Sequence, residues 1–296
     1  MVASDIELPV IMLLLCLFEI ISQCDLRWVV HLRGARDLVL LRRRHQAAAS
    51  RDGGVPFSDT FFAYQYVIGR TACGEQPVFN SSYWDTDDSI IDGWLGCSPA
   101  LVSIVARVTE LSRQRAQIPE SAFLSQAASL ESDLDSLEQL PPGEMDAVLI
   151  HVAELKFLAA KVVFYASLHN ADPHTPLIRE LVGTILRSFR GMPQSGSRAA
   201  LLWPLFVAAV ELDPQDDDFE SDVNDNNAFT GRRMVLDELE ILALNSLANV
   251  ARARAVIVKI WQSRDDSDAE TLQPRIAGAN DWERFVAPFC SNMSLA

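Results

Sequence analysis

Residues 201–211 of this chain read LLWPLFVAAVE. The stretch is apolar over the length of a short helix, carries Pro204 inside it, and is followed by a segment dense in acidic residues. A helix that is apolar on every side is normally buried. Because a proline in a helix interior removes a backbone donor and clashes with the preceding turn, the sequence predicts a buried, kinked helix here.

The sequence around this stretch is helical in pattern. Apolar residues recur at spacings of three and four, most clearly over residues 145–166 and 235–261, and strand signals are nearly absent. We therefore expect an all-α fold, a single multi-helix bundle or array of nine to ten helices that occupies residues 1–296. The predicted helices cover residues 7–23, 27–45, 57–72, 99–116, 120–138, 144–169, 176–190, 196–212 and 230–263, with a short terminal helix near 281–287.

Local signals support several of these helix starts. Ser98 and Thr175 each place a hydroxyl before a proline, which is typical of an N-cap followed by the first helical residue, and Thr230 is a further cap candidate.

Two segments are predicted to be irregular. Residues 73–97 combine turn-forming residues with Tyr83, Trp84 and Trp94, which indicates an ordered loop held by aromatic rings. Residues 213–227 form an acidic loop, expected to be solvated.

The apolar stretch from Leu8 to Ile21 resembles a signal sequence at first sight. Acidic residues Asp5 and Glu7 precede it where a positive charge belongs, and Glu19 interrupts it. It is also shorter than the roughly 20 apolar residues that span a bilayer. We therefore predict a buried amphipathic helix and no membrane association.

Composition argues against direct DNA binding by this chain alone. The net charge is −15 over 296 residues and the sequence pI is about 4.7, whereas DNA-binding surfaces are strongly basic. The one concentration of positive charge comprises Arg33, Arg36 and residues 42–45, and a helix end is the simpler interpretation. An import signal or a contact with an acidic partner is the alternative.

The five cysteines contain no C-x-x-C pair, which favours free thiols in a reducing compartment.

No catalytic, cofactor-binding or metal-binding residue is predicted, and we expect the chain not to be an enzyme. Asp87-Asp88 with Asp92, and Asn224-Asp225 further on, invite comparison with the metal motifs of terpene cyclases. The second motif fails, because Ala228 and Arg232 stand where a hydroxyl and a glutamate ligand are needed. The five histidines lack a metal-binding spacing: His169 and His174 flank a turn and are expected at the surface, and His151 is expected to be a partly buried structural residue.

Four segments, taken in order, resemble a known family. They are residues 28–35 (WVVHLRGA); residues 61–64 (FFAY) with residues 95–101 (LGCSPAL); residues 202–209 (LWPLFVAA) with Glu211; and Asn249-Val250 with residues 258–261 (VKIW) and Asp281-Trp282. Together they are similar to the C-terminal regulatory domain of fungal-specific transcription factors, whose N-terminal head is a binuclear zinc cluster held by six cysteines.

The resemblance implies a non-catalytic, all-α regulatory domain that works in the nucleus through protein partners, as a homodimer or with a full-length relative. Gly34 is expected to permit a close helix crossing, and Trp203, Trp261 and Trp282 to fill core space. The six cysteines of a zinc-cluster head do not precede this region, so no cofactor is expected in the chain itself. The alternatives are a headless protein that modulates full-length relatives, or a helical small-molecule binder or enzyme. The acidic loop 213–227, with Phe219, is either a solvated linker or an activation surface.

Overall fold

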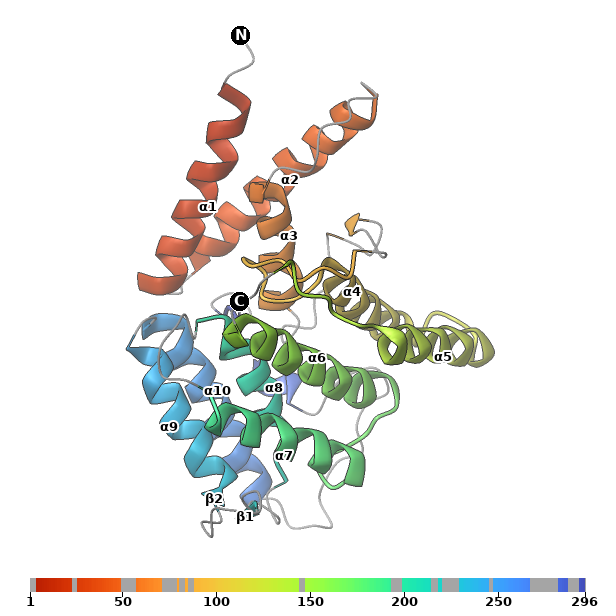
Figure 1. Ribbon diagram of the computed structural model, residues 1–296, viewed down its shortest axis with the longest axis vertical. Helices are drawn as coiled ribbons and strands as arrows, with labels where there is room; N and C mark the ends of the chain where they lie inside the picture. Colours follow the sequence, from red (N-terminus) through yellow and green to blue (C-terminus); the bar gives the residue numbers. More distant parts are fainter. Residues whose placement is uncertain are drawn as a thin grey trace.

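The computed structural model describes residues 4–22, 26–48, 57–70, 79, 83–84, 88–143, 147–192, 199–213, 218–219, 229–244, 247–266, 282–286 and 293–295. Over these residues the chain is an all-α array, as the sequence predicted (Figure 1). The helices are α1 (Ser4–Ser22), α2 (Leu26–Ala48), α3 (Phe57–Arg70), α4 (Pro99–Gln114), α5 (Glu120–Ser136), α6 (Ala147–Leu168), α7 (Pro176–Arg190), the 3-10 turn Ala199–Leu201, α8 (Leu202–Val210), α9 (Gly231–Ala243), α10 (Leu247–Asp265) and α11 (Glu283–Val286). One antiparallel pair of two-residue strands, β1 (Asp218–Phe219) and β2 (Phe229–Thr230), completes the described elements.

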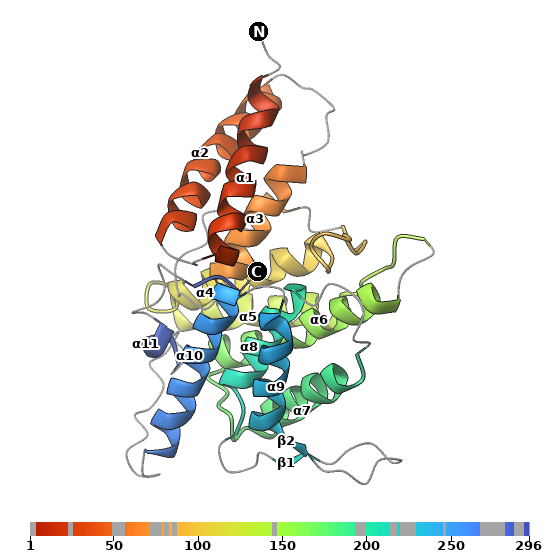
Figure 2. The same cartoon turned by 90° about the vertical axis from the view of Figure 1, so that its left-hand side faces the viewer.

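The helices form two regions. Helices α1, α2 and α3 stand together at one end of the molecule, above a body that contains α4 to α10 (Figures 1 and 2). We call α1 with α2 the arm. Within the body, α8 contacts α6, α7, α9 and α10, so it is the central helix around which the others pack.

Every residue of α8 is buried, as its apolar sequence predicted. The predicted kink was wrong. Pro204 lies in the first turn of α8, directly after the 3-10 turn, rather than in the interior of one helix over 196–212. Backbone N–H groups of a first turn have no partner within the helix, so a proline there removes nothing that the helix uses.

The buried C-terminal end of α8 is capped by side chains from later in the chain. Trp261 Nε1 donates to the Ala209 carbonyl at 2.8 Å, and Arg264 Nη1 donates to the Val210 carbonyl at 2.6 Å. Trp282 Nε1 donates to the carboxylate of Glu211, which is 1% exposed, at 2.8 Å. The last carbonyls of a helix lack partners within it, so these contacts satisfy groups that burial would otherwise leave unpaired.

The prediction of one helix over residues 230–263 was also wrong, because two helices, α9 and α10, occupy this stretch and pack against each other. A continuous helix could not fold back on itself in this way. The sequence contained the signal: its apolar stripe steps by five residues from Leu242 to Leu247, and a helical face repeats at three or four.

The remaining local predictions had mixed outcomes. Ser98 caps α4, since its Oγ accepts from Leu101 N at 3.3 Å. Thr175 and Thr230 stand at the N-cap positions of α7 and α9, but neither side chain makes the capping bond. Thr175 Oγ1 instead bonds Asp172, whose backbone N–H donates to it at 3.0 Å. In the described part of the loop before α4, rings of Phe79, Tyr83 and Trp84 contact one another in turn, and Trp94, although 71% exposed, contacts the ring of Phe57 at a centroid distance of 5.0 Å.

Candidate interaction surface

The most unusual surface of the described chain is the outer face of α1. Seven large apolar side chains on this one helix are between 40% and 64% exposed. We call them the α1 face: Leu8, Val10, Ile11, Leu14, Leu15, Phe18 and Ile21. A contiguous apolar patch of this kind on a protein surface marks a site of interaction, because leaving it in water is unfavourable.

The spacing within the α1 face is that of a helix-pairing seam. Ile11, Leu14, Phe18 and Ile21 follow one another at steps of three, four and three, which are the a and d positions of a heptad repeat. Leu8, Val10 and Leu15 flank this row. A second helix laid along α1 would therefore insert its side chains between these residues.

The opposite face of α1 is fixed to the rest of the molecule. Leu13, Cys16 and Ile20 are buried in the common core, and α1 contacts α2, α3 and α10. The prediction of a buried amphipathic helix was therefore wrong for half of its circumference: both faces are apolar and one of them is exposed. Among the described residues, no helix is long and apolar enough to cross a membrane.

The crossing of α1 and α2 is close, as predicted for Gly34. A Cβ added at Gly34 would lie 2.8 Å from Met12 Cε, so only a glycine fits without displacing the methionine. Trp28 on α2 is fully buried. Because the inner side of α1 is held in this way, the α1 face is presented by a packed helix.

The basic stretch of α2 is in part structural. Arg42 Nη1 donates to the fully buried carboxylate of Asp59 on α3 at 2.9 Å, which ties the two helices together. Burying a carboxylate is unfavourable unless a cation pairs with it, so Arg42 is needed for packing. Arg33 is exposed, Arg36 bonds its neighbour Asp37, and the side chains of residues 43–45 lie outside the described part.

A second unusual feature is a buried polar cluster between α3, α6 and the loop before α4. Lys156 is 0% exposed; its Nζ donates to the hydroxyl of Tyr64 at 2.6 Å and to the carbonyl of Leu95 at 2.5 Å. Cys97 Sγ contacts the same carbonyl at 3.7 Å. We call Lys156, Tyr64 and Cys97 the lysine cluster.

Burial governs the titration of the lysine cluster. Desolvation lowers the pKa of Lys156, which the nearby Cys97 partly offsets. Desolvation raises the pKa of Cys97 to about 11, against a smaller lowering by Lys156, and raises the pKa of Tyr64 well above 10.0. All three shifts favour neutral groups, and the cluster joins three segments of the core, so we assign it a structural role.

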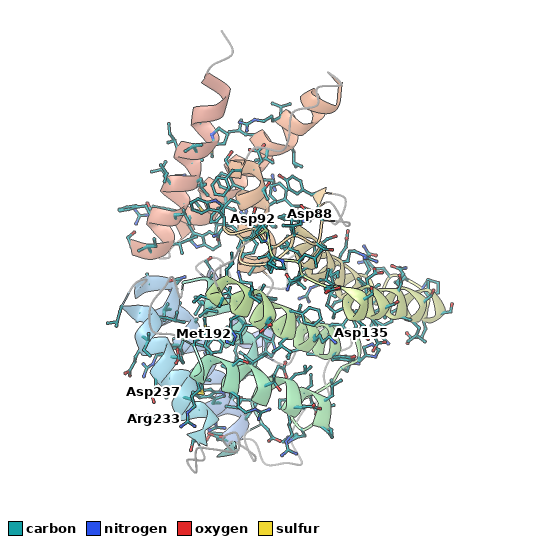
Figure 3. The ribbon with its side chains drawn as sticks, in the orientation of Figure 1. Asp88, Asp92, Asp135, Met192, Arg233 and Asp237 are labelled. Atoms are coloured by element: carbon teal, nitrogen blue, oxygen red, sulfur yellow. The ribbon has the colours of Figure 1, made fainter. Side chains whose placement is uncertain are left out.

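Asp88 and Asp92, whose spacing invites comparison with a metal motif, bond the backbone of the loop before α4. Figure 3 shows Asp88 and Asp92 on this loop. Asp92 Oδ1 accepts from the backbone of Trp94 at 2.7 Å and of Leu95 at 3.0 Å, and Asp88 Oδ1 accepts from Ile90 N at 3.1 Å. These carboxylates stabilise turns. Asp87 and residues 224–225 lie outside the described residues, and within the described ones no three potential ligands cluster around a metal position.

His151, His169 and His174 occupy structural or surface positions, as predicted. His151 Nε2 lies 3.0 Å from the carbonyl of Ser188, and His169 is exposed beside two aromatic rings. His174 Nδ1 lies 3.1 Å from Asp213.

Asp213 is only 5% exposed, so the first residue of the predicted acidic loop belongs to the packed body. Most of residues 214–228 lie outside the described part, so the solvation of this loop stays a prediction.

The described residues form an all-α array with an exposed apolar face on α1. A family model described as the fungal specific transcription factor domain matches residues 2–296. The chain belongs to this family, as its four sequence segments indicated, and its role is therefore in transcription regulation. No curated protein and no solved structure matches the chain.

Proposed function

We propose that the chain is a non-catalytic regulatory domain of a transcription factor, that it acts in the nucleus, and that the α1 face joins it to a second copy of itself. Family membership supports the regulatory role. The observation that carries the mode of action is the α1 face, seven exposed apolar side chains on one packed helix. The proposal treats residues 1–296 as one domain and assigns no catalytic residue, metal or cofactor to it.

The lack of charge on the α1 face is compatible with a second copy as the occupant. Two chains that each carry a net charge of −15 repel one another, and this repulsion is weakest where the facing surfaces carry no charge. The α1 face contains no ionisable side chain, and Glu19 on the same helix is turned inward toward Arg27 at 3.4 Å. Heptad spacing is also self-complementary, because a helix with an a/d seam pairs best with another such helix.

DNA recognition in this proposal belongs to another segment or another protein. A surface with this excess of acid does not hold phosphate backbones, so the domain contributes dimerisation and regulation. The same α1 face also suits the second candidate function, a headless protein that pairs with the equivalent domain of a full-length relative and modulates it. Co-purification of that relative distinguishes the two.

A tethering experiment tests the proposal. The full chain is fused to a DNA-binding module that needs dimerisation to occupy its site, and a reporter gene measures occupancy in fungal nuclei. The native fusion should regulate the reporter, and Leu14→Glu with Phe18→Glu should abolish this regulation, because two buried charges in the seam cost several kcal/mol. Leu124→Glu is the matched control, since Leu124 is an exposed apolar residue of α5 at 53%.

Loss of regulation in the α1 double variant, with normal regulation by the Leu124→Glu control, supports the proposal. Regulation that survives the double variant contradicts a role for the α1 face. Exclusion of a fluorescent fusion of the native chain from the nucleus contradicts the proposed place of action.

A further inference from the structure

The central row of the α1 face has the same spacing in both directions along the helix. Ile11, Leu14, Phe18 and Ile21 are separated by steps of three, four and three, so the row is symmetric about position 16. All four side chains are exposed, between 49% and 64%. A row with this symmetry can meet a second copy of itself with the two helices parallel or antiparallel. The direction decides which residues face one another.

Antiparallel pairing matches the sizes of the facing side chains. With both rows centred on position 16, Ile11 of each copy faces Ile21 of the other, and Leu14 faces Phe18. Parallel pairing would set Phe18 against Phe18 and Leu14 against Leu14, which makes one bulky layer beside one small layer. Apolar side chains pack most densely when large ones face smaller ones, so the antiparallel direction gives the more even contact.

The charge of the chain is distributed unevenly along α1. Residues 1–48, which contain the arm, carry six arginines and five acidic residues, so their net charge is +1 and residues 49–296 account for −16. In Figures 1 and 2 the N-terminal end of α1 points away from the body, and its C-terminal end lies at the body. The contact of α1 with α10 joins the two regions there. The acidic part of each chain is therefore at one end of the α1 face.

The direction of pairing sets the distance between the two acidic bodies. Parallel pairing would place both bodies side by side at the same end of the paired helices. Antiparallel pairing places them at opposite ends, separated by the length of α1, roughly 28 Å for its 19 residues. At physiological salt, repulsion between exposed charges is largely screened beyond about 8 Å. Repulsion between the bodies therefore opposes parallel pairing much more than antiparallel pairing.

The charges at the two ends of α1 favour the same direction. Asp5 and Glu7 precede the row, so parallel pairing would gather four carboxylates at one end of the pair. In the antiparallel direction they come to the start of the partner's α2, where the Arg27 side chain is 54% exposed and Asp25 precedes it in the sequence. Each end of an antiparallel pair therefore combines acidic and basic residues.

We propose that two copies of the chain pair through antiparallel α1 helices, so that both arms form one four-helix bundle between two acidic bodies. This inference rests on the proposed pairing of the α1 faces and adds its direction. Helices α1 and α2 already run antiparallel within each arm (Figure 1), which is the usual relation of neighbours in such a bundle. The bodies then stand at opposite ends of the dimer, each available to its own partners.

Disulfide trapping in the full chain tests the direction. Ile11→Cys and Ile21→Cys are made separately, in chains that differ in length by a tag, and are oxidised mildly, alone and as a mixture. Mass spectrometry of peptides identifies which positions are joined, so the native cysteines can stay. The mixture should contain a disulfide between positions 11 and 21, and neither variant alone should join to itself. In the antiparallel pair the two copies of position 11 lie about 15 Å apart along the axis, whereas a disulfide needs Cα atoms within about 7 Å.

Leu124→Cys is the matched control, since Leu124 is exposed on α5, and it should give no disulfide between chains. Joining of Ile11→Cys to itself and of Ile21→Cys to itself would show parallel pairing, which overturns the inference and leaves the proposed dimer intact. A chain that sediments as a dimer without any of these disulfides would overturn the inference and place the contact away from the α1 face. A native chain that sediments at the single-chain mass would overturn both the pairing and its direction.

Discussion

Helices α8 and α1 are both built almost entirely from apolar residues, but the molecule uses them differently. All nine residues of α8 are buried, and its C-terminal carbonyls are capped by Trp261 and Arg264. On α1, one face is buried and the opposite face exposes seven large apolar side chains. The side chains of helix α8 are therefore fully packed within one chain. Helix α1 has an apolar face that no described residue of its own chain covers.

This difference separates residues that hold the fold from residues available for a partner. Apolar side chains of α8 lose contact with water on folding, so each should contribute to the free energy of unfolding. Those of the α1 face remain in water in the isolated chain, so they should contribute little to it. The predictions below rest on this contrast.

Truncation of a central side chain should have the largest effect. Trp203 on α8 is 1% exposed, and Trp203→Ala should lower the free energy of unfolding by about 3–5 kcal/mol, because it removes buried surface and leaves a cavity. Urea denaturation followed by circular dichroism measures this. A change below about 1 kcal/mol would mean that α8 is not the centre of the core.

Alkaline pH should weaken the body through the lysine cluster. Since the pKa of Cys97 is 9.0 in an unfolded chain and about 11 in the fold, the stability due to its neutral thiol is complete below pH 9 and is lost as pH rises through 11. The raised pKa of Tyr64 acts in the same direction at higher pH, and the lowered pKa of Lys156 acts in the opposite direction.

Cys97→Ala isolates this contribution. Between pH 9 and 11 the native chain should lose about 2–3 kcal/mol more of its free energy of unfolding than the variant does. Denaturant titrations at several pH values provide the measurement. Identical pH profiles for the native chain and the variant would show that the thiol is not buried in the folded state.

A pair of glycines tests the packing around the same cluster. Gly96 and Gly143 both have positive φ, at 64° and 75°. A Cβ at Gly96 would lie 3.0 Å from Val152 Cγ1 and 3.2 Å from Lys156 Nζ, whereas a Cβ at Gly143 would meet nothing within 4 Å. Gly143→Ala should cost about 1 kcal/mol from backbone strain alone, and Gly96→Ala about 2–3 kcal/mol. Equal melting temperatures for the two variants would contradict the close approach of Lys156.

Substitution on the α1 face should have the smallest effect on the stability of the isolated chain. Phe18 is 64% exposed, and Phe18→Ser should change the free energy of unfolding by no more than about 0.5 kcal/mol when measured at a concentration where chains are separate. Denaturation of dilute protein is the relevant assay. A loss of several kcal/mol would place Phe18 in the core and remove the distinction between α1 and α8.

Much of the fold could be predicted from local sequence signals. The prediction of 176–190 agrees with α7, because Pro176 fixes the first helical residue and Gly191 follows the last. The break between α9 and α10 was missed, although the apolar period fails there. The burial of Trp203, Trp261 and Trp282 was predicted, but their convergence on the end of α8 depends on contacts between distant segments.

The α1 face could not be predicted in the same way. Both sides of α1 are apolar, so its sequence does not show which face packs on α2.

The most direct test of the account is the mass of the purified chain by sedimentation equilibrium at micromolar concentration. The native chain and Leu124→Glu should sediment at twice the single-chain mass of 32.8 kDa, and the variant that carries both Leu14→Glu and Phe18→Glu should sediment at the single-chain mass with an unchanged circular dichroism spectrum. A native chain that stays at the single-chain mass, or a double variant that still sediments as a dimer, would contradict the claim that the α1 face is covered by a second copy.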